Sequence, residues 1–280
     1  MTHRGKVLWI EGLAGVGAGL RHDIMSGGFE MEVASSVADA LRRLRQEPSD
    51  VVLTSPSSTV AEDVAVVRRA RQLRPGMKMI VLAPEATSED VVAILRAHAF
   101  ACFREPFDSA EIISMIHRAL AEDDWRDGIS VHSANPDWVT LRVASRRLTA
   151  ERMVAFVDVL VPELPDGPRN ALVIAFREIL QNAMEHGAGF DPEKMIEVSA
   201  IRTASAHVFH LRDPGEGFSL DDLPHAAVSN PPDQPTAHVE YRDARGMRPG
   251  GFGILMTRRL VDEVLYNETG NEVVLIQYRS

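Results

Sequence analysis

The segment EILQNAMEHG, residues 178–187, places three polar side chains at steps of four in an otherwise apolar stretch. Glu178, Asn182 and His186 would share one slowly drifting face of a helix, because each helical residue advances by about 100°. A carboxylate can act as a general base, and an amide oxygen can bind Mg²⁺. This polar face is either a wet surface or part of a site, and the segment alone does not decide between them.

Two glycine-containing segments further along the chain could complete a nucleotide pocket. In LRDPGEGF, residues 211–218, Asp213 ends a predicted strand and can accept a hydrogen bond from the exocyclic amine of adenine. The glycines after it let the backbone approach a base and a sugar closely. In PGGFGILMTRRLVDEV, residues 249–264, three glycines precede a predicted helix whose free N–H groups can cradle phosphate. The glycines of the two segments are Gly215, Gly217, Gly250, Gly251 and Gly253.

In this order the three segments resemble the N, G1 and G2 boxes of the Bergerat-type (GHKL, histidine kinase-like) ATPases. Within that superfamily they look most like the anti-sigma factor serine kinases. The resemblance covers residues 138–280 and implies bound ATP and Mg²⁺. It makes Asn182 the magnesium ligand, Glu178 the general base, and residues 219–250 the nucleotide lid. The nucleotide-binding positions that it implies are Asn182, His186, Gly187, Asp213, Gly215, Gly217, Phe218, Gly250, Gly251 and Gly253.

The resemblance implies a serine/threonine kinase that phosphorylates a small anti-anti-sigma (STAS-like) protein. The partner would be that protein, a sigma factor, or both, and such kinases commonly pair as homodimers. An ATP-gated protein-binding switch without phosphotransfer stays open, although the intact Glu178 favours the enzyme. A histidine kinase-like module is a third alternative. It is disfavoured because His117 lacks the acidic residue and the proline usual around a phosphoacceptor histidine.

Several of these residues also have a purely structural interpretation. His186 before Gly187 could be a cation that meets the dipole at a helix C-terminus. Asp213 could be a simple turn residue, and the glycines near position 250 could be ordinary loop residues. Asp262 and Glu263 are expected to be structural or solvent-facing. The chain contains no GxxxxGK[ST] sequence, so a P-loop nucleotide site is not expected.

Composition excludes several other classes of function. The chain has 280 residues, 30 of them Lys or Arg and 40 Asp or Glu, for a formal charge of −10. Neither half is basic, so direct binding of nucleic acid or of an anionic membrane is not expected. The single cysteine, Cys102, excludes an intramolecular disulfide and should be buried. No stretch reaches the roughly 20 apolar residues of a membrane span, and no signal-peptide pattern is seen. We therefore expect a soluble cytoplasmic protein.

The order of predicted elements indicates two domains. In residues 1–123 five strands alternate with five helices, which predicts a flavodoxin-like doubly wound parallel sheet. Residues 124–137 are polar, contain Gly and Pro, and are predicted to be a linker. Residues 138–280 predict an α+β sandwich with helices on one face of a mixed or antiparallel sheet. In this half we expect one helix over 168–186 and another over 252–267.

The first domain resembles the receiver domains of response regulators in its element order and in the segment EPFDSAEI after the fifth strand. Receivers need acidic residues after the first strand, an aspartate after the third, a hydroxyl after the fourth and a lysine after the fifth. Here Glu11 is followed by Gly12, and the other three positions hold Ser55, Ala83 and Glu105. We expect a receiver-like fold without phosphotransfer, which docks, dimerises or controls the neighbouring domain.

Overall fold

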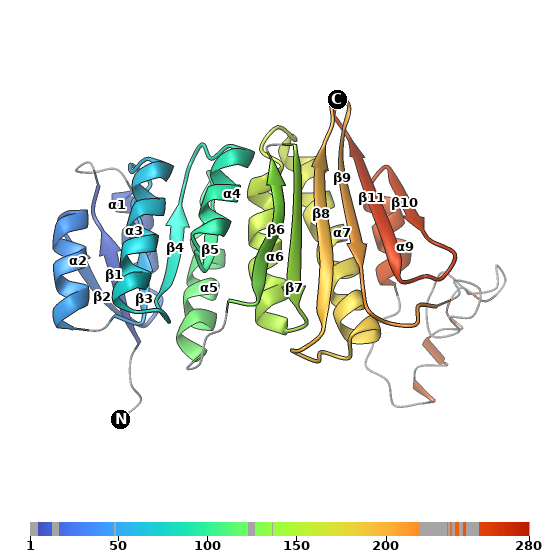
Figure 1. Cartoon of the computed structure of the whole chain (residues 1–280), viewed down its shortest axis with the longest axis horizontal. Coiled ribbons are helices and arrows are strands. Elements are labelled where there is room, and N and C mark those ends of the chain that lie inside the picture. The colour runs from blue at the N-terminus through green and yellow to red at the C-terminus, as the bar shows by residue number, and fades with distance from the viewer. Residues whose placement is uncertain are drawn as a thin grey trace. The chain divides into compact units, whose positions relative to one another are not determined.

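The computed structural model describes residues 5–12, 17–47, 49–122, 127–135, 137–218, 234, 236, 239–240, 243–244 and 252–279. Contacts within the chain divide it into two compact units, Met1–Ser130 and Val131–Ser280. The first unit is coloured blue to green in Figure 1, and the second runs from green to red.

The first unit is built on a parallel five-stranded sheet. All of its strand pairs are parallel, and the spatial order is β2-β1-β3-β4-β5. This is the flavodoxin-like doubly wound order, so the predicted fold class of this half is confirmed. The strands are β1 (Lys6–Ile10), β2 (Glu30–Ala34), β3 (Val51–Leu53), β4 (Lys78–Leu82) and β5 (Ala101–Phe103).

Local capping explains where the helices of this unit begin. The side chains of Ser36, Thr59, Thr87 and Asp108 accept hydrogen bonds from the first-turn N–H groups of four helices, each worth about 1 kcal/mol. The helices are α1 (Ala18–Met25), α2 (Val37–Gln46), α3 (Val60–Leu73), α4 (Ser88–Arg96) and α5 (Ser109–Ala121). Strands β3 and β4 are buried throughout, as helices on both faces require, and Cys102 in β5 is buried as predicted.

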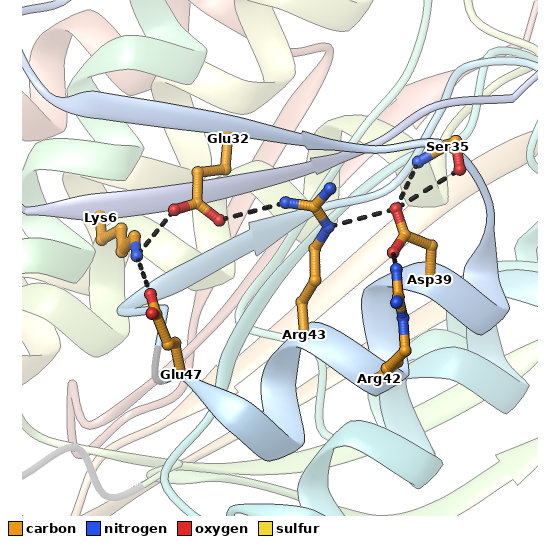
Figure 2. A network of polar contacts seen from close by, with 7 residues as sticks. All are labelled: Lys6, Glu32, Ser35, Asp39, Arg42, Arg43 and Glu47. Carbon is orange, nitrogen blue, oxygen red and sulfur yellow. Dashed lines mark hydrogen bonds and ion pairs between the residues drawn. The ribbon is translucent and has the colours of Figure 1, made fainter.

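An ion-pair network ties α2 to strands β1 and β2 (Figure 2). The Lys6 amine lies 2.7 Å from carboxylate oxygens of both Glu32 and Glu47. Arg43 bridges Glu32, at 3.6 Å, and Asp39, at 3.1 Å. Hydrogen bonds to Glu32 and then Glu47 raise the pKa of Lys6 above its usual range. Because most of these side chains remain partly exposed, the network adds little stability.

The second unit is an α+β sandwich on a six-stranded sheet of order β10-β11-β9-β8-β7-β6. The pairings of β7 with β8, β8 with β9, β9 with β11 and β11 with β10 are antiparallel. This confirms the fold class predicted for this half. The strands are β6 (Ile129–Asn135), β7 (Trp138–Ala144), β8 (Met195–Arg202), β9 (Ala206–Arg212), β10 (Glu263–Tyr266) and β11 (Glu272–Tyr278).

The described helices of this unit lie on one side of the sheet (Figure 1). They are α6 (Arg147–Leu160), α7 (Asp166–Asn182), the π-helix η1 (Ala183–Gly187) and α9 (Gly253–Leu260). The core between the layers includes an edge-to-face pair of Phe176 and Phe209, with ring centroids 5.5 Å apart. Across the described parts of the chain, no helix combines the length and apolarity that crossing a membrane requires.

Two elements differ from the prediction. Residues 129–135, inside the predicted linker, form β6, whose mixed polar sequence gave no alternating signal. The helix expected over 252–267 was wrong beyond Leu260, because Val261 is extended (φ −122°, ψ 162°) and residues 263–266 pair with β11. Pairing with an available strand overrides the helical pattern of so short a segment.

Candidate functional site

The polar face of α7 lies against the first turn of α9. Helix α7 buries Phe176, Ile179 and Leu180 on the core side, while Glu178 and Asn182 remain partly exposed. A Cβ atom placed on Gly253 would lie 3.0 Å from Glu178 Oε2 and 3.7 Å from Asn182 Nδ2. The glycine that opens α9 thus lies beside the predicted base Glu178 and close to the predicted magnesium ligand Asn182.

The end of the motif is not the regular α-helix that the spacing predicted. Residues 183–187 form a π-helical turn, and the Ala188 N–H donates to the Ala183 carbonyl at 3.0 Å. His186 lies within this turn, and its side chain is exposed. Single π-helical turns occur often at functional sites. The predicted nucleotide contact of His186 stays a prediction.

Asp213 packs directly on Gly187, so the second motif meets the end of the first. A Cβ atom on Gly187 would lie 2.1 Å from Asp213 Oδ1, and one on Gly215 would lie 2.8 Å from the same oxygen. The Gly215 N–H donates to Asp213 Oδ1 at 2.8 Å. Partial burial raises the pKa of Asp213, and the Gly215 hydrogen bond opposes that shift. Both glycines are needed for the carboxylate to sit where it does.

The turn between β10 and β11 holds the loop that carries Asp213. The Asp213 N–H donates to the Asn271 carbonyl at 3.0 Å, and Asn271 Nδ2 donates to the Gly215 carbonyl at 3.4 Å. Gly217 has φ +80°, and a Cβ atom there would lie 2.0 Å from the Thr269 carbonyl oxygen. The sequence did not predict this support, because residues 263–266 were expected to be helical and not to form the β10–β11 hairpin.

Phe218 anchors the end of the same loop. Its ring meets that of Tyr266 edge to face, with centroids 5.5 Å apart. Burial raises the pKa of the Tyr266 hydroxyl to about 12, so the phenol stays neutral. Gly270 has φ +82°, and a Cβ atom there would lie 2.0 Å from the Phe218 carbonyl oxygen. Phe218 is therefore held by the hairpin as well.

Most of the predicted site residues are thus gathered at the α7–η1 end, the 213–218 loop and the start of α9. Gly250, Gly251 and most of the predicted lid, residues 219–250, lie outside the described residues. Among the described residues no group of three acidic, histidine or cysteine side chains could hold a metal by itself. A neutral amide beside one carboxylate fits a Mg²⁺ ion whose remaining ligands are phosphate oxygens and waters.

The corresponding edge of the first unit is filled by hydroxyl groups. Ser55, at the phosphoacceptor position, is buried, and its Oγ lies 2.9 Å from Ser57 Oγ. A Cβ atom on Gly12 would lie 2.4 Å from Ser55 Oγ. Glu11 is paired with Arg21 at 2.5 Å. That this end of the sheet takes no phosphate stays a prediction. The packing of Ser55 and Ser57 against Gly12 supports it, because these side chains occupy the space.

Comparison with known families agrees with this division. Residues 143–277 match the model of the histidine kinase-like ATPase domain family. That range contains α7, the Asp213 loop, α9 and the hairpin that braces the loop. The second unit therefore carries a histidine kinase-like ATPase domain.

Curated relatives are transcriptional regulators. The chain is 25% identical to the transcriptional regulatory protein GlrR of Escherichia coli K12 over 193 residues, which is 64% of this chain and 41% of that protein. It is 28% identical to the transcriptional regulatory protein PrrA of Mycobacterium tuberculosis over 115 residues, or 41% of this chain and 49% of PrrA. The chain thus spans less than half the length of either relative.

Solved receiver domains also align with part of the chain. A CheY-like receiver from Methanospirillum hungatei is 23% identical, with a TM-score of 0.37 over 41% of this chain and 93% of its own. A response regulator from Thermotoga maritima is 19% identical, with a TM-score of 0.38 over 42% and 98%. The strand order β2-β1-β3-β4-β5 of the first unit is the doubly wound order shared by flavodoxin and CheY.

Proposed function

Starting from a chain that joins a receiver (CheY-like) domain to a histidine kinase-like ATPase domain, we propose an ATP-binding regulatory protein of the anti-sigma factor type. Its activity is that of a serine/threonine kinase. The substrate is a hydroxyl group on a small anti-anti-sigma (STAS-like) protein, and a sigma factor is a further binding partner. The receiver-like domain controls the kinase without being phosphorylated itself.

The convergence of Glu178, Asn182 and Gly253 carries this proposal. A purely nucleotide-gated binding surface needs the amide and the glycine, but it has no use for a carboxylate beside them. The contact of Gly253 with Glu178 Oε2 puts a carboxylate where the N-terminus of α9 begins. Helix N-termini favour phosphate through their free N–H groups and dipole. A base next to a phosphate-binding helix end is the arrangement that phosphoryl transfer needs.

Each residue has a separate task in this reaction. ATP would donate its γ-phosphoryl group and leave as ADP, and Asp213 would accept a hydrogen bond from the adenine amine. Asn182 offers a neutral oxygen to Mg²⁺. Glu178 removes the proton of the acceptor hydroxyl as the oxygen attacks. The protein contributes positioning and charge stabilisation, which account for most of the catalysis of phosphoryl transfer.

The test is a pair of substitutions on one helix, measured for binding and for transfer. Glu178→Gln should keep ATP affinity within about threefold while lowering labelled phosphate transfer to an STAS-like protein by 100-fold or more. Asn182→Ala should weaken Mg²⁺-dependent ATP binding itself. Gln181→Ala, an exposed position on the same helix, should change neither quantity.

The outcomes separate the enzyme from the binding switch. Transfer by Glu178→Gln at the rate of the unsubstituted protein would reject the base assignment. If ATP binds and increases affinity for the partner, but no transfer occurs, the protein is an ATP-gated switch. Absence of ATP binding in the unsubstituted protein would reject both functions.

A further inference from the structure

The chain that follows the π-helical turn η1 has a strained backbone. Gly189 and Phe190 are both left-handed, with φ of +66° and +52°. A helix end commonly uses one left-handed residue, and Gly189 supplies it without steric cost. The second one, Phe190, is a bulky residue in a conformation that costs free energy and that persists only where neighbouring groups hold it. Strain of this kind concentrates at functional sites.

The carbonyl group of Met184 links this strain to the π-helical turn. In a regular α-helix that carbonyl would accept the N–H of Ala188, four residues further on. Here the Ala188 N–H donates to the Ala183 carbonyl at 3.0 Å, and the Met184 carbonyl accepts the Phe190 N–H at 2.7 Å. The Ser145 hydroxyl donates to the same Met184 carbonyl at 3.3 Å. A carbonyl oxygen has two lone pairs, so these two donors occupy the acceptor that the α-helical register would need.

The junction between β7 and α6 holds this segment at three points. Ser145, directly after β7, is fully buried, and besides its contact with Met184 its N–H donates to the Lys194 carbonyl at 3.0 Å. Two residues further on, the Arg147 guanidinium carbon lies 4.6 Å from the centroid of the Phe190 ring. A guanidinium placed over an aromatic face is attracted by it. The left-handed conformation of Phe190 is therefore supported through both its backbone and its ring.

The π-helical turn supports the loop that carries Asp213. Gly187 is the last residue of the turn, and a Cβ atom on it would lie 2.1 Å from Asp213 Oδ1. A Cβ atom on Gly215 would lie 2.8 Å from the Gly187 Cα atom. The Asp213 loop therefore rests on the Gly187 backbone at two places. A change of η1 from the π-helical to the α-helical register would move that backbone and withdraw the support.

We propose that Ser145 and Phe190 are positioning residues that set base selectivity at the nucleotide site. By holding η1 in its π-helical register, they keep Gly187 in place and, through Gly187, the Asp213 carboxylate. Asp213 then accepts a hydrogen bond from the exocyclic amine of adenine. Guanine carries a carbonyl oxygen at the corresponding position, which a carboxylate repels. The inference rests on the proposed function in one respect, namely that the ligand is ATP.

The test is the ratio of the dissociation constants for Mg²⁺–GTP and Mg²⁺–ATP, measured on the full chain by competition titration. A folding defect lowers the active fraction and leaves this ratio unchanged, whereas a displaced Asp213 weakens the binding of ATP alone. The unsubstituted chain should favour ATP by about 100-fold or more, because a site built around one hydrogen bond rejects a ligand that cannot make it.

Three variants remove the supports one at a time. Ser145→Ala should lower the ratio about tenfold. Phe190→Pro, which has no N–H and cannot adopt a positive φ, should lower it by about 30-fold or more. Phe190→Gly keeps the N–H and adopts a positive φ without strain, so its ratio should stay within about threefold of the unsubstituted value. Ser205→Ala, exposed in the turn between β8 and β9, is the matched control and should leave the ratio unchanged.

Ser145→Ala and Phe190→Gly decide the matter even if Phe190→Pro does not fold. A ratio in Ser145→Ala equal to that of the unsubstituted chain overturns the proposal. So does a loss of about tenfold or more in Phe190→Gly, because the effect would then belong to the ring and not to the backbone register. An unsubstituted chain that binds ATP and GTP equally overturns this inference and leaves the kinase proposal to its transfer assay. A chain that binds neither nucleotide overturns both.

Discussion

The two units place glycines next to polar side chains in opposite ways. In the first unit, the space beside Gly12 at the sheet edge is filled by the hydroxyls of Ser55 and Ser57. In the second unit, Gly187 and Gly253 lie beside Asp213 and Glu178, whose carboxylates stay at least partly exposed. Glycine thus lies beside hydroxyl groups that bond to each other in the first unit, and beside carboxylates that stay partly exposed in the second. What decides the outcome is whether the neighbouring polar groups bond to each other or remain available to a ligand.

The largest effect on ATP binding should come from adding one methyl group beside Asp213 in the second unit. Gly187→Ala should weaken ATP binding more than 100-fold in calorimetric titration, because the new Cβ atom displaces the Asp213 carboxylate from the position it holds. Gly167→Ala, with no neighbouring atom within 4 Å of the added carbon, is the matched control and should bind ATP normally. Equal affinity of the two variants for ATP would show that Asp213 does not contact the adenine.

A second prediction concerns the buried carboxyl group behind the serine cluster of the first unit. Asp63 is 1% exposed, Ser58 donates to its Oδ1 at 2.6 Å, and its Oδ2 has no hydrogen-bond partner among the described residues. Burial raises the pKa of Asp63 to about 7. The folded state then binds more protons than the unfolded state between about pH 4 and 7. The contribution of Asp63 to stability is therefore greatest below that window and falls as pH rises through it.

The expected loss across this window is about 2–4 kcal/mol in the free energy of unfolding. Denaturant titrations at several pH values would measure it. Asp63→Asn, which cannot ionise, should remove this slope, while Glu89→Gln on the exposed side of α4 should retain it. A slope that Asp63→Asn does not change would mean that the carboxyl group is ionised in the folded protein throughout.

A smaller effect should follow from loosening the hairpin that braces the Asp213 loop. Asn271→Ala removes the side-chain hydrogen bond to the Gly215 carbonyl and should raise the dissociation constant for ATP about tenfold, equivalent to about 1.4 kcal/mol. Its effect on phosphate transfer at saturating ATP should be slight. Asn271 helps to position Asp213, the proposed contact to adenine, and does not touch the reacting atoms. Glu268→Ala, exposed in the same turn, serves as the control. Unchanged affinity in Asn271→Ala would restrict its role to folding of the hairpin.

For the first unit we expect no phosphorylation at all. Acetyl phosphate with Mg²⁺ should leave no acid-stable, base-labile label on the first unit, because Ser55 cannot form an acyl phosphate and is already hydrogen-bonded within its own cluster. A receiver with an intact aspartate serves as the positive control in the same assay. Any such label that maps to residues 5–122 would contradict the hydroxyl-filled description of this edge.

The sequence by itself determined much of this protein. Apolar strands that alternate along the chain with capped helices predicted the parallel sheet of the first unit. Both signals are local, because hydrophobic periodicity and capping residues are read within a few neighbouring positions. The spacing of Glu178 and Asn182, and the glycines beside Asp213 and before α9, indicated which segments would meet. Their roles toward ATP remain predictions that the contacts support without testing.

Only the tertiary structure decided the rest. Strand β10 forms because β11 offers a pairing edge, and that hairpin in turn holds the loop of Asp213 through Asn271 and Thr269. The π-helical turn over residues 183–187 has no signature in the residue spacing. Which side chains share a face of the second sheet is known only from the strand register, because a shift of one residue would send every side chain to the opposite face. Long-range pairing, not local preference, sets strand β10 and the support of the Asp213 loop.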